Sequence, residues 1–440
     1  MRFHRVFVVV LLLALAPLAR GQNFELLTSF QCSGMAGPNG ALVQLSDGSL
    51  YGVASSGGSN SNGAVFRFSN GVLTNLVSFN GTNGSRPQGG LMLASDGFLY
   101  GTTYQGGVSN LGTVFQTTTN GALTNLVSFT GTNGAGPWAE LIQGMDGAFY
   151  GTTYSGGSNN SGSVFTMTSN GVLTTLASLG APHGNLPRGK LVQDVVGNFF
   201  GTTESGGTKG IGTVFRMTAG GAVTTLASLS DGALPSAGLF LANDGNYYGV
   251  TRIGGANNDA GTIFKITAEG LLTTVVSFVR PTTGALPHAG IVQAHDGNFY
   301  GTTSQFGTGG YGAVYKMTPS GALTVVVSFK GANGSDPEAP LLRGNDGNLY
   351  GTTVSGSSPS STGNIFRIII PFVLNSRLSG NQLVLSWPTN AVGFSLQSTA
   401  DLNSPVNWIN STNAPAVVGG QFTVTNSISA SAQFYRLKKP

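Results

Sequence analysis

Charged side chains are scarce in this 440-residue chain. Aspartate, glutamate, lysine and arginine together make up 8% of it, against about 25% in an ordinary globular protein. The 20 basic residues are scattered, apart from Arg436, Lys438 and Lys439 near the C-terminus, and 16 acidic residues nearly balance them. A nucleic-acid-binding protein gathers its lysines and arginines into a basic patch. We therefore predict that nucleic acid is not a partner.

Cysteine and histidine are also rare, with one cysteine and four histidines, of which His4 lies near the N-terminus. Cys32 is the one cysteine of the chain, so no intramolecular disulfide can form and the fold must be held by packing. His183, His288 and His295 lie in separate parts of the sequence. The sequence contains no cysteine cluster, no His-Glu-x-x-His motif and no nucleophile elbow in a strand-turn-helix context. These observations predict no catalytic residue, no metal site and no cofactor.

A long apolar run occurs once, at the N-terminus. Arg2 and Arg5 accompany the run Val6–Ala16, and small residues follow at Ala19 and Gly21, which is typical of a signal peptide. We predict a signal peptide over residues 1–21 and a secreted or extracytoplasmic mature protein of the cell envelope. A retained anchor is the alternative, but the run is shorter than the roughly 20 residues that span a bilayer. We expect no transmembrane segment after the signal is removed.

Glycine is abundant, with 69 residues, and much of it belongs to a tandem repeat. An aromatic residue followed by glycine recurs every 48 to 52 residues, at Tyr51, Tyr100, Tyr150, Phe200, Tyr248, Tyr300 and Tyr350. A second landmark, Gly-x-(Val/Ile)-aromatic with one Asn-Ile-Phe variant, follows each pair, starting at Gly63, Gly112, Gly162, Gly212, Gly261, Gly312 and Gly363. Both landmarks count seven units, and such periods are the signature of a repeat architecture.

Each unit has the pattern of a four-stranded antiparallel meander. In the second unit the predicted strands are Gly89–Ala94, Phe98–Tyr104, Gly112–Thr118 and Ala122–Phe129. The hairpin signals Asp-Gly and Asn-Gly separate the first two and the last two of these strands. Apolar residues fall on both faces of the strands, so we expect both faces to be buried. Four-stranded sheets repeated around an axis form a β-propeller.

The last unit lacks its fourth strand. Six units end in the pattern L-T-x-L-x-S-F or a variant, whereas the seventh runs into Ile368–Pro371 without one, and Leu26–Phe30 carries that pattern alone near the N-terminus. Pairing of this strand with the seventh unit would leave no open sheet edge. We therefore predict an all-β fold: a seven-bladed β-propeller over residues 22–370, closed by the N-terminal strand. A β-solenoid or an open array is the alternative.

A different pattern begins after Pro371. Short candidate strands over residues 371–440 predict a small β-sandwich module, with Trp387, Phe394, Trp408, Phe422 and Phe434 as its core. Alternatively, Trp408 and Tyr435 form a platform for a sugar.

The repeated strings F-Y-G-T-T-x-x-G-G, G-T-V-F and L-T-x-L-x-S-F resemble the GloVer-type tandem repeats of exported bacterial proteins, also described as a choice-of-anchor repeat family, over residues 24–370. Phe306-Gly307 and Gly356-Ser357 depart from the Gly-Gly element. The tail, which ends in Phe434–Leu437, resembles the C-terminal modules attached to such proteins. The resemblance implies export and a β-propeller repeat scaffold, and it carries no catalytic residue over to this chain.

Acidic residues recur in the Asp-Gly turn of six units. Asp47, Asp96, Asp146, Asp244, Asp296 and Asp346 occupy it. A ring of calcium sites is conceivable there, but aspartate is a common turn residue and glycine supplies the positive φ. We interpret these residues as turn formers.

Two positions of the repeat vary while their neighbours stay constant. A proline precedes each aromatic-Gly pair by 13 residues, and the residue after it is in turn Asn39, Gln88, Trp138, Arg188, Ser236, His288 and Glu338. At the exit of the second strand the series is Ser55, Tyr104, Tyr154, Glu204, Arg252, Ser304 and Val354. Both positions should open on one face of the ring. We predict a ligand-binding site there, made of Gln88, Tyr104, Trp138, Tyr154, Arg188, Glu204, Arg252, His288 and Glu338; drift at exposed loop positions is the alternative explanation.

Three classes of function remain open. We favour an exported, monomeric binding or scaffold protein whose propeller face binds a polysaccharide or a peptide through aromatic stacking and hydrogen bonds. The first alternative is a polysaccharide lyase or glycosidase that uses Glu204 or Glu338 with Arg188 or His288 as acid and base. The second is a structural surface protein that associates with itself.

Overall fold

The computed structural model describes residues 24–31, 33–257, 259–356, 362–389, 391, 393–403, 406–427 and 433–438. The predicted signal peptide and Cys32 lie outside these ranges. The described residues form strands, turns and loops without a helix, so the predicted all-β class is confirmed. The chain divides into two compact units, of which one comprises Phe24–Gly344 and Leu349–Ile368 and the other takes in the residues from Ile369 onward.

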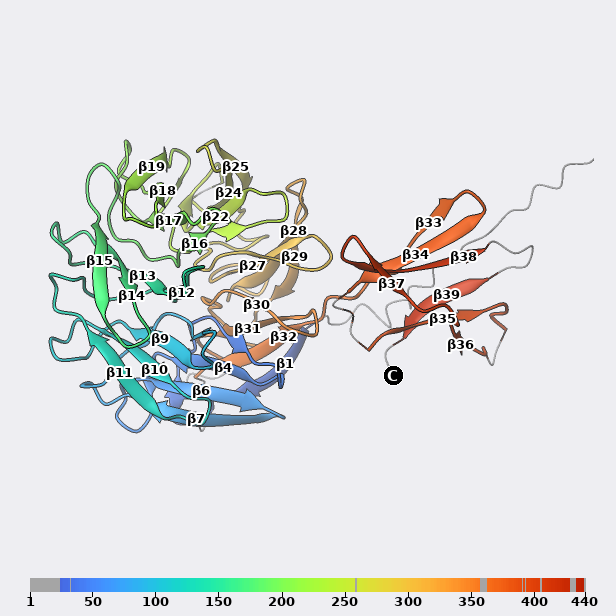
Figure 1. Ribbon diagram of the computed structural model, residues 1–440, viewed down its shortest axis with the longest axis horizontal. Coiled ribbons are helices and arrows are strands. Elements are labelled where there is room, and N and C mark those ends of the chain that lie inside the picture. The colour runs from blue at the N-terminus through green and yellow to red at the C-terminus, as the bar shows by residue number, and fades with distance from the viewer. Residues whose placement is uncertain are drawn as a thin grey trace, which may run out of the picture. The chain divides into compact units, whose positions relative to one another are not determined.

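Seven four-stranded antiparallel sheets make up the larger unit within the described ranges, and Figure 1 shows them in chain order from blue to orange. Their first strands are β3 (Val43–Gln44), β8 (Met92–Leu93), β12 (Ile142–Gln143), β16 (Val192–Gln193), β21 (Phe240–Leu241), β26 (Val292–Gln293) and β30 (Leu342–Arg343). Their second strands are β4 (Leu50–Ala54), β9 (Leu99–Thr103), β13 (Phe149–Thr153), β17 (Phe199–Thr203), β22 (Tyr247–Thr251), β27 (Phe299–Thr303) and β31 (Leu349–Thr353).

The outer half of each sheet repeats in the same way. The third strands are β6 (Ala64–Ser69), β10 (Thr113–Thr117), β14 (Ser163–Met167), β18 (Thr213–Met217), β24 (Thr262–Ile266), β28 (Ala313–Met317) and β32 (Asn364–Ile368). The fourth strands are β7 (Val72–Ser78), β11 (Leu123–Ser128), β15 (Leu173–Ser178), β19 (Val223–Ser228), β25 (Leu272–Ser277), β29 (Leu323–Ser328) and, in the last sheet, β1 (Phe24–Ser29). Two short pairs join β2 (Met35–Ala36) to β5 (Ser56–Gly57) and β20 (Gly232–Ala233) to β23 (Ile253–Gly254).

Two details of the predicted strands are corrected. Pairing of the first strand in the second sheet begins only at Met92, because the residues before it run beside the next sheet: a Cβ on Gly89 would lie 2.6 Å from the carbonyl of Ala139. Burial on both faces holds for the second strands, such as β9, but not for the fourth. Thr124 and Asn125 of β11 are exposed, because this strand forms the outer edge of its sheet.

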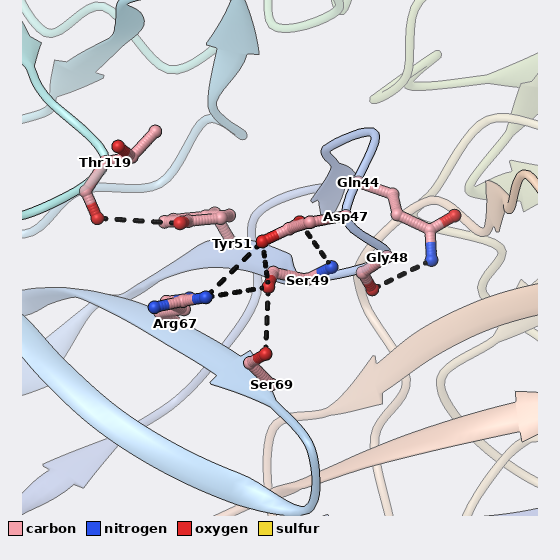
Figure 2. A network of polar contacts seen from close by, with 8 residues as sticks. All are labelled: Gln44, Asp47, Gly48, Ser49, Tyr51, Arg67, Ser69 and Thr119. Carbon is pink, nitrogen blue, oxygen red and sulfur yellow. Dashed lines mark hydrogen bonds and ion pairs between the residues drawn. The ribbon is translucent and has the colours of Figure 1, made fainter.

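The Asp-Gly hairpins use their aspartates as structural acceptors. In the first sheet Asp47 accepts hydrogen bonds from the backbone N–H and the hydroxyl of Ser49, both at 2.9 Å, and pairs with Arg67 at 3.4 Å (Figure 2). The backbone bond from Ser49 is the main cause that lowers the pKa of Asp47. In the second sheet the hydroxyl of Tyr100 donates to Asp96 at 2.7 Å, and the same bond recurs in the third, fifth and sixth. The interpretation as turn residues accounts for these carboxylates.

The hydrophobic core lies between neighbouring sheets. One cluster combines Tyr100 and Phe129 of the second sheet with Phe149 and Phe165 of the third. The glycine of the aromatic-Gly pair makes this packing possible, since a Cβ on Gly151 would lie 2.6 Å from Cζ of Phe165. The conserved spacing of the repeat thus places an aromatic ring over a glycine in every sheet.

The N-terminal strand completes the last sheet, as predicted. Strand β1 pairs antiparallel with β32, with Leu26 opposite Phe366 (Figure 1), and Glu25 pairs with Arg367 through an Nε–Oε2 distance of 3.0 Å. Strand β31 of the same sheet is linked to the first sheet's segment by the hydroxyl of Thr352, which donates to the carbonyl of Pro38 at 2.6 Å. The first and last sheets are therefore neighbours.

Within the described residues, the smaller unit contains two sheets. They consist of β33 (Asn375–Ser379), β34 (Gln382–Pro388), β38 (Gln421–Ser427) and β37 (Ala416–Val418), and of β36 (Ile409–Asn410), β35 (Ser395–Thr399) and β39 (Phe434–Lys438). Both sheets contribute to one cluster around Trp387, against which Phe394 and Phe422 pack. Tyr435 is 7% exposed within this cluster, so it does not form a surface platform. The guanidinium of Arg436 lies over the ring of Trp408, 4.3 Å from its centroid.

Candidate functional site

One cavity of about 540 Å³ is lined by the segments that lead into the first strands of all seven sheets. The residue after the repeated proline lines it in every sheet: Asn39, Gln88, Trp138, Arg188, Ser236, His288 and Glu338. Equivalent positions of the repeat therefore surround a common space. We call the end of the cavity that these seven residues surround its mouth.

Five mouth residues from the second to fourth sheets contact one another, and we call them the aromatic arc: Tyr104, Trp138, Tyr154, Arg188 and Glu204. The ring of Trp138 lies 4.9 Å from that of Tyr104, edge to face, and 6.2 Å from that of Tyr154. The guanidinium of Arg188 lies 4.0 Å from the centroid of Trp138 and pairs with Glu204 at 3.1 Å. The hydroxyl of Tyr154 donates to Glu204 at 3.3 Å.

This network fixes the side chains of the aromatic arc before any ligand arrives. Glu204 is 8% exposed and is held by a cation and a hydroxyl. The carboxylate of Glu204, together with burial, raises the pKa of Tyr154, burial being the larger cause. A fixed, partly desolvated wall of this kind loses little side-chain entropy on binding.

Three further residues, from the fifth to seventh sheets, form what we call the open arc: Arg252, His288 and Glu338. Burial, with the positive charges of Arg252 and Arg188, lowers the pKa of His288 to about 4, so the imidazole is neutral at pH 7. Burial raises the pKa of Glu338, while Arg188 and Arg252 act in the opposite direction. Nε of Arg252 is buried without a hydrogen-bond partner.

The remaining predicted residue, Gln88, lies between the arcs. Its side chain is 7% exposed and accepts a hydrogen bond from Nδ2 of Asn39. Five of the nine predicted residues line the cavity: Gln88, Trp138, Arg188, His288 and Glu338. Tyr104, Tyr154 and Glu204 contact lining residues, whereas Arg252 is not a lining residue. The role of all nine in binding stays a prediction.

The residues at the opposite end of the cavity were not predicted from the sequence. Four residues after each variable mouth position stands an apolar side chain. Five of these seven line the cavity and form what we call the floor ring: Val43, Met92, Phe240, Val292 and Leu342. Every one is partly buried and begins a first strand. The apolar residue that recurs four positions after each variable one was the available signal in the sequence.

Between mouth and floor the lining is mostly small, with one charged pair. Nζ of Lys190 lies 3.4 Å from Glu140, and both residues line the cavity. The residues at the same level in other sheets include Gly90, Gly238 and Gly290, which leave room for a ligand. The cavity is therefore polar at its mouth and mainly apolar at its floor, where Arg343 also lines it.

In the described ranges, no group of three or more histidine, cysteine, aspartate or glutamate side chains is placed to hold a metal ion. Within the same ranges, no helix is long and apolar enough to cross a bilayer.

Solved structures with the same fold are distant in sequence. The chain is similar to the extracellular domains of two hybrid two-component systems from B. thetaiotaomicron. For the first, identity is 12%, the TM-score is 0.53 and coverage is 92% of this chain and 53% of that one; for the second the values are 10%, 0.52, 91% and 47%. It is also similar to a puromycin-hydrolyzing peptidase of Mycobacterium tuberculosis (10% identity, TM-score 0.51, coverage 79% and 57%).

The chain spans about half the length of the two extracellular domains that it matches. At such low identity these similarities establish the β-propeller fold alone. No curated protein matches the sequence. The repeat itself is matched by a family model, that of the Gloeobacter/Verrucomicrobia repeat, over residues 37–258 and 195–377. Since these ranges cover most of the 440 residues, the chain belongs to the Gloeobacter/Verrucomicrobia repeat family.

Proposed function

We propose that the protein is an exported binding or scaffold protein, monomeric, whose cavity mouth binds a polysaccharide or a peptide. In this proposal residues 22–370 form a closed seven-bladed propeller and residues 371–440 a β-sandwich module. The supporting observation is that seven chemically different side chains occupy one equivalent position around a single cavity. A purely mechanical ring needs no such variety at the one position that faces the cavity.

Two further observations support binding at the mouth. The volume of about 540 Å³ falls within the range of 300–1,000 Å³ usual for ligand sites. The aromatic arc is fixed by an ion pair, a cation–π contact and a hydroxyl bond, and tryptophan, tyrosine and arginine are the residues that most often dominate binding energy.

The double substitution Trp138→Ala and Tyr154→Ala should weaken ligand binding at least about tenfold, because truncating central aromatic residues of a binding site typically costs 2 kcal/mol or more. Arrays of glycans and peptides identify ligands for the mature protein, and titration calorimetry then compares the variants. Tyr311→Ala, at an aromatic side chain that is 51% exposed outside the cavity lining, is the control. Unchanged affinity in the double variant would remove the aromatic arc from the site.

A further inference from the structure

The two arcs of the mouth differ in how their polar groups are satisfied. In the aromatic arc, Arg188 and Glu204 neutralise each other. In the open arc, Arg252 and Glu338 take part in none of the four ion pairs among the described residues. Nε of Arg252 is shielded from water and has no acceptor, which is an unfavourable state for a buried donor. The open arc therefore carries one unpaired cation and one unpaired anion.

These two charges act on the same space. Glu338 and His288 line the cavity. Arg252 directly follows β22, as Tyr104 and Tyr154 follow β9 and β13, and its charge acts on both Glu338 and His288. His288 is neutral at pH 7 and supplies one donor and one acceptor between the fifth and seventh sheets. A ligand that carries only a carboxylate would satisfy Arg252 and leave Glu338 unpaired, whereas a ligand with both charges would satisfy both residues.

The rest of the cavity restricts the ligand further. Its floor ring is apolar. Its middle level has glycines in the second, fifth and sixth sheets, and the charged side chains there, Lys190 and Glu140, are paired with each other. A side chain of the ligand that passes the glycines therefore meets an apolar surface. A neutral sugar offers neither charge, and hydroxyl groups on all its sides would be desolvated against the floor ring at a cost in free energy. An oligopeptide offers an ammonium group, a carboxylate and apolar side chains together.

We propose that the mouth recognises a short zwitterionic peptide, with the terminal carboxylate on Arg252, the terminal ammonium on Glu338 and an apolar side chain directed to the floor ring. This inference rests on the proposed function and specifies its ligand class. His288 accepts or donates a hydrogen bond beside the two termini. The aromatic arc forms the opposite wall of the mouth.

The probe is trileucine in four forms: free, N-acetylated, C-amidated and blocked at both ends. Calorimetry on the mature wild-type protein should give the tightest binding for the free form. Each single block should weaken binding about ten- to hundredfold, because a hydrogen bond to a charged group contributes roughly that factor. Trialanine should bind more weakly than trileucine, because it buries less apolar surface against the floor ring.

Two variants assign each terminus to its residue. Arg252→Met should abolish the effect of C-amidation and keep that of N-acetylation, and Glu338→Gln should do the reverse. Arg377→Met, which removes an exposed arginine outside the cavity lining, and Glu269→Gln, at an exposed turn, are the matched controls and should keep both effects. A merely structural role of either residue would weaken all four peptide forms alike.

The outcomes separate this inference from the proposed function. Equal binding of the free and doubly blocked peptides to the wild-type protein overturns the inference without need of any variant, and so does a ligand set restricted to glycans; either result leaves the proposed binding function intact. Absence of binding to both glycan and peptide arrays overturns both.

Discussion

Deletion of residues 24–30 should cause the protein to aggregate. Without β1, the edge of β32 loses its partner strand, and an exposed, apolar strand edge is a template for association. The deletion also removes Phe30, which is fully buried in the cluster that joins the last sheet to the first. Size-exclusion chromatography with light scattering and a thermal unfolding scan measure the result.

Point variants separate the loss of packing from the loss of the strand. Phe30→Ala should lower the free energy of unfolding by about 3–5 kcal/mol, the usual cost of removing a buried phenylalanine. Leu26→Ala, in the same strand but 47% exposed, should cost less than about 1 kcal/mol. A soluble monomer with an unchanged melting temperature after the deletion would contradict closure by this strand.

Phe165→Ala should cost about 3–5 kcal/mol of unfolding free energy, since its ring is fully buried between the second and third sheets. Gly151→Ala should cost about 1–3 kcal/mol, because the added methyl group would lie 2.6 Å from Cζ of Phe165 and 2.7 Å from Leu141. In the double variant the methyl group enters the space that the phenylalanine leaves. The cost of Gly151→Ala should then fall, and urea denaturation of all three variants measures this coupling.

Val172→Ala, at a side chain that is 60% exposed, serves as the control and should change stability by less than about 0.5 kcal/mol. Strictly additive costs of Phe165→Ala and Gly151→Ala would mean that the two residues do not share one packing site. In that case the aromatic-Gly pair of the repeat would need another explanation.

Much of the fold was predictable from sequence because the landmarks of the repeat recur at a nearly constant spacing and so mark the equivalent positions of each unit. The Asp-Gly and Asn-Gly hairpins set the strand order of each sheet, and the isolated pattern at Leu26–Phe30 identified the missing fourth strand. Strand lengths were less predictable. The segment at Gly89 resembles a strand in composition, but its backbone lies against the neighbouring sheet, and such an approach between distant segments leaves no local signal.

The candidate site was predictable in place but not in detail. Trp138, Arg188 and His288 occupy the same position of the repeat, and this is enough to infer that they surround one space. It does not reveal that Arg188 covers Trp138 and pairs with Glu204, because these contacts depend on side-chain rotamers and on the spacing between sheets. For the same reason the sequence did not distinguish the satisfied aromatic arc from the unpaired open arc.

Disulfide trapping tests the central claim, closure by the N-terminal strand, most directly. Glu25 and Arg367 face each other across β1 and β32, so the variant Glu25→Cys with Arg367→Cys, in a Cys32→Ser background, should cross-link on oxidation and raise the melting temperature. The control, Glu25→Cys with Lys316→Cys, uses the position of the preceding sheet that is equivalent to Arg367 and should stay reduced. Mass spectrometry of nonreduced peptides should find the bond between residues 25 and 367 alone; failure of that pair to cross-link, or equal cross-linking of the control, would contradict the closed propeller.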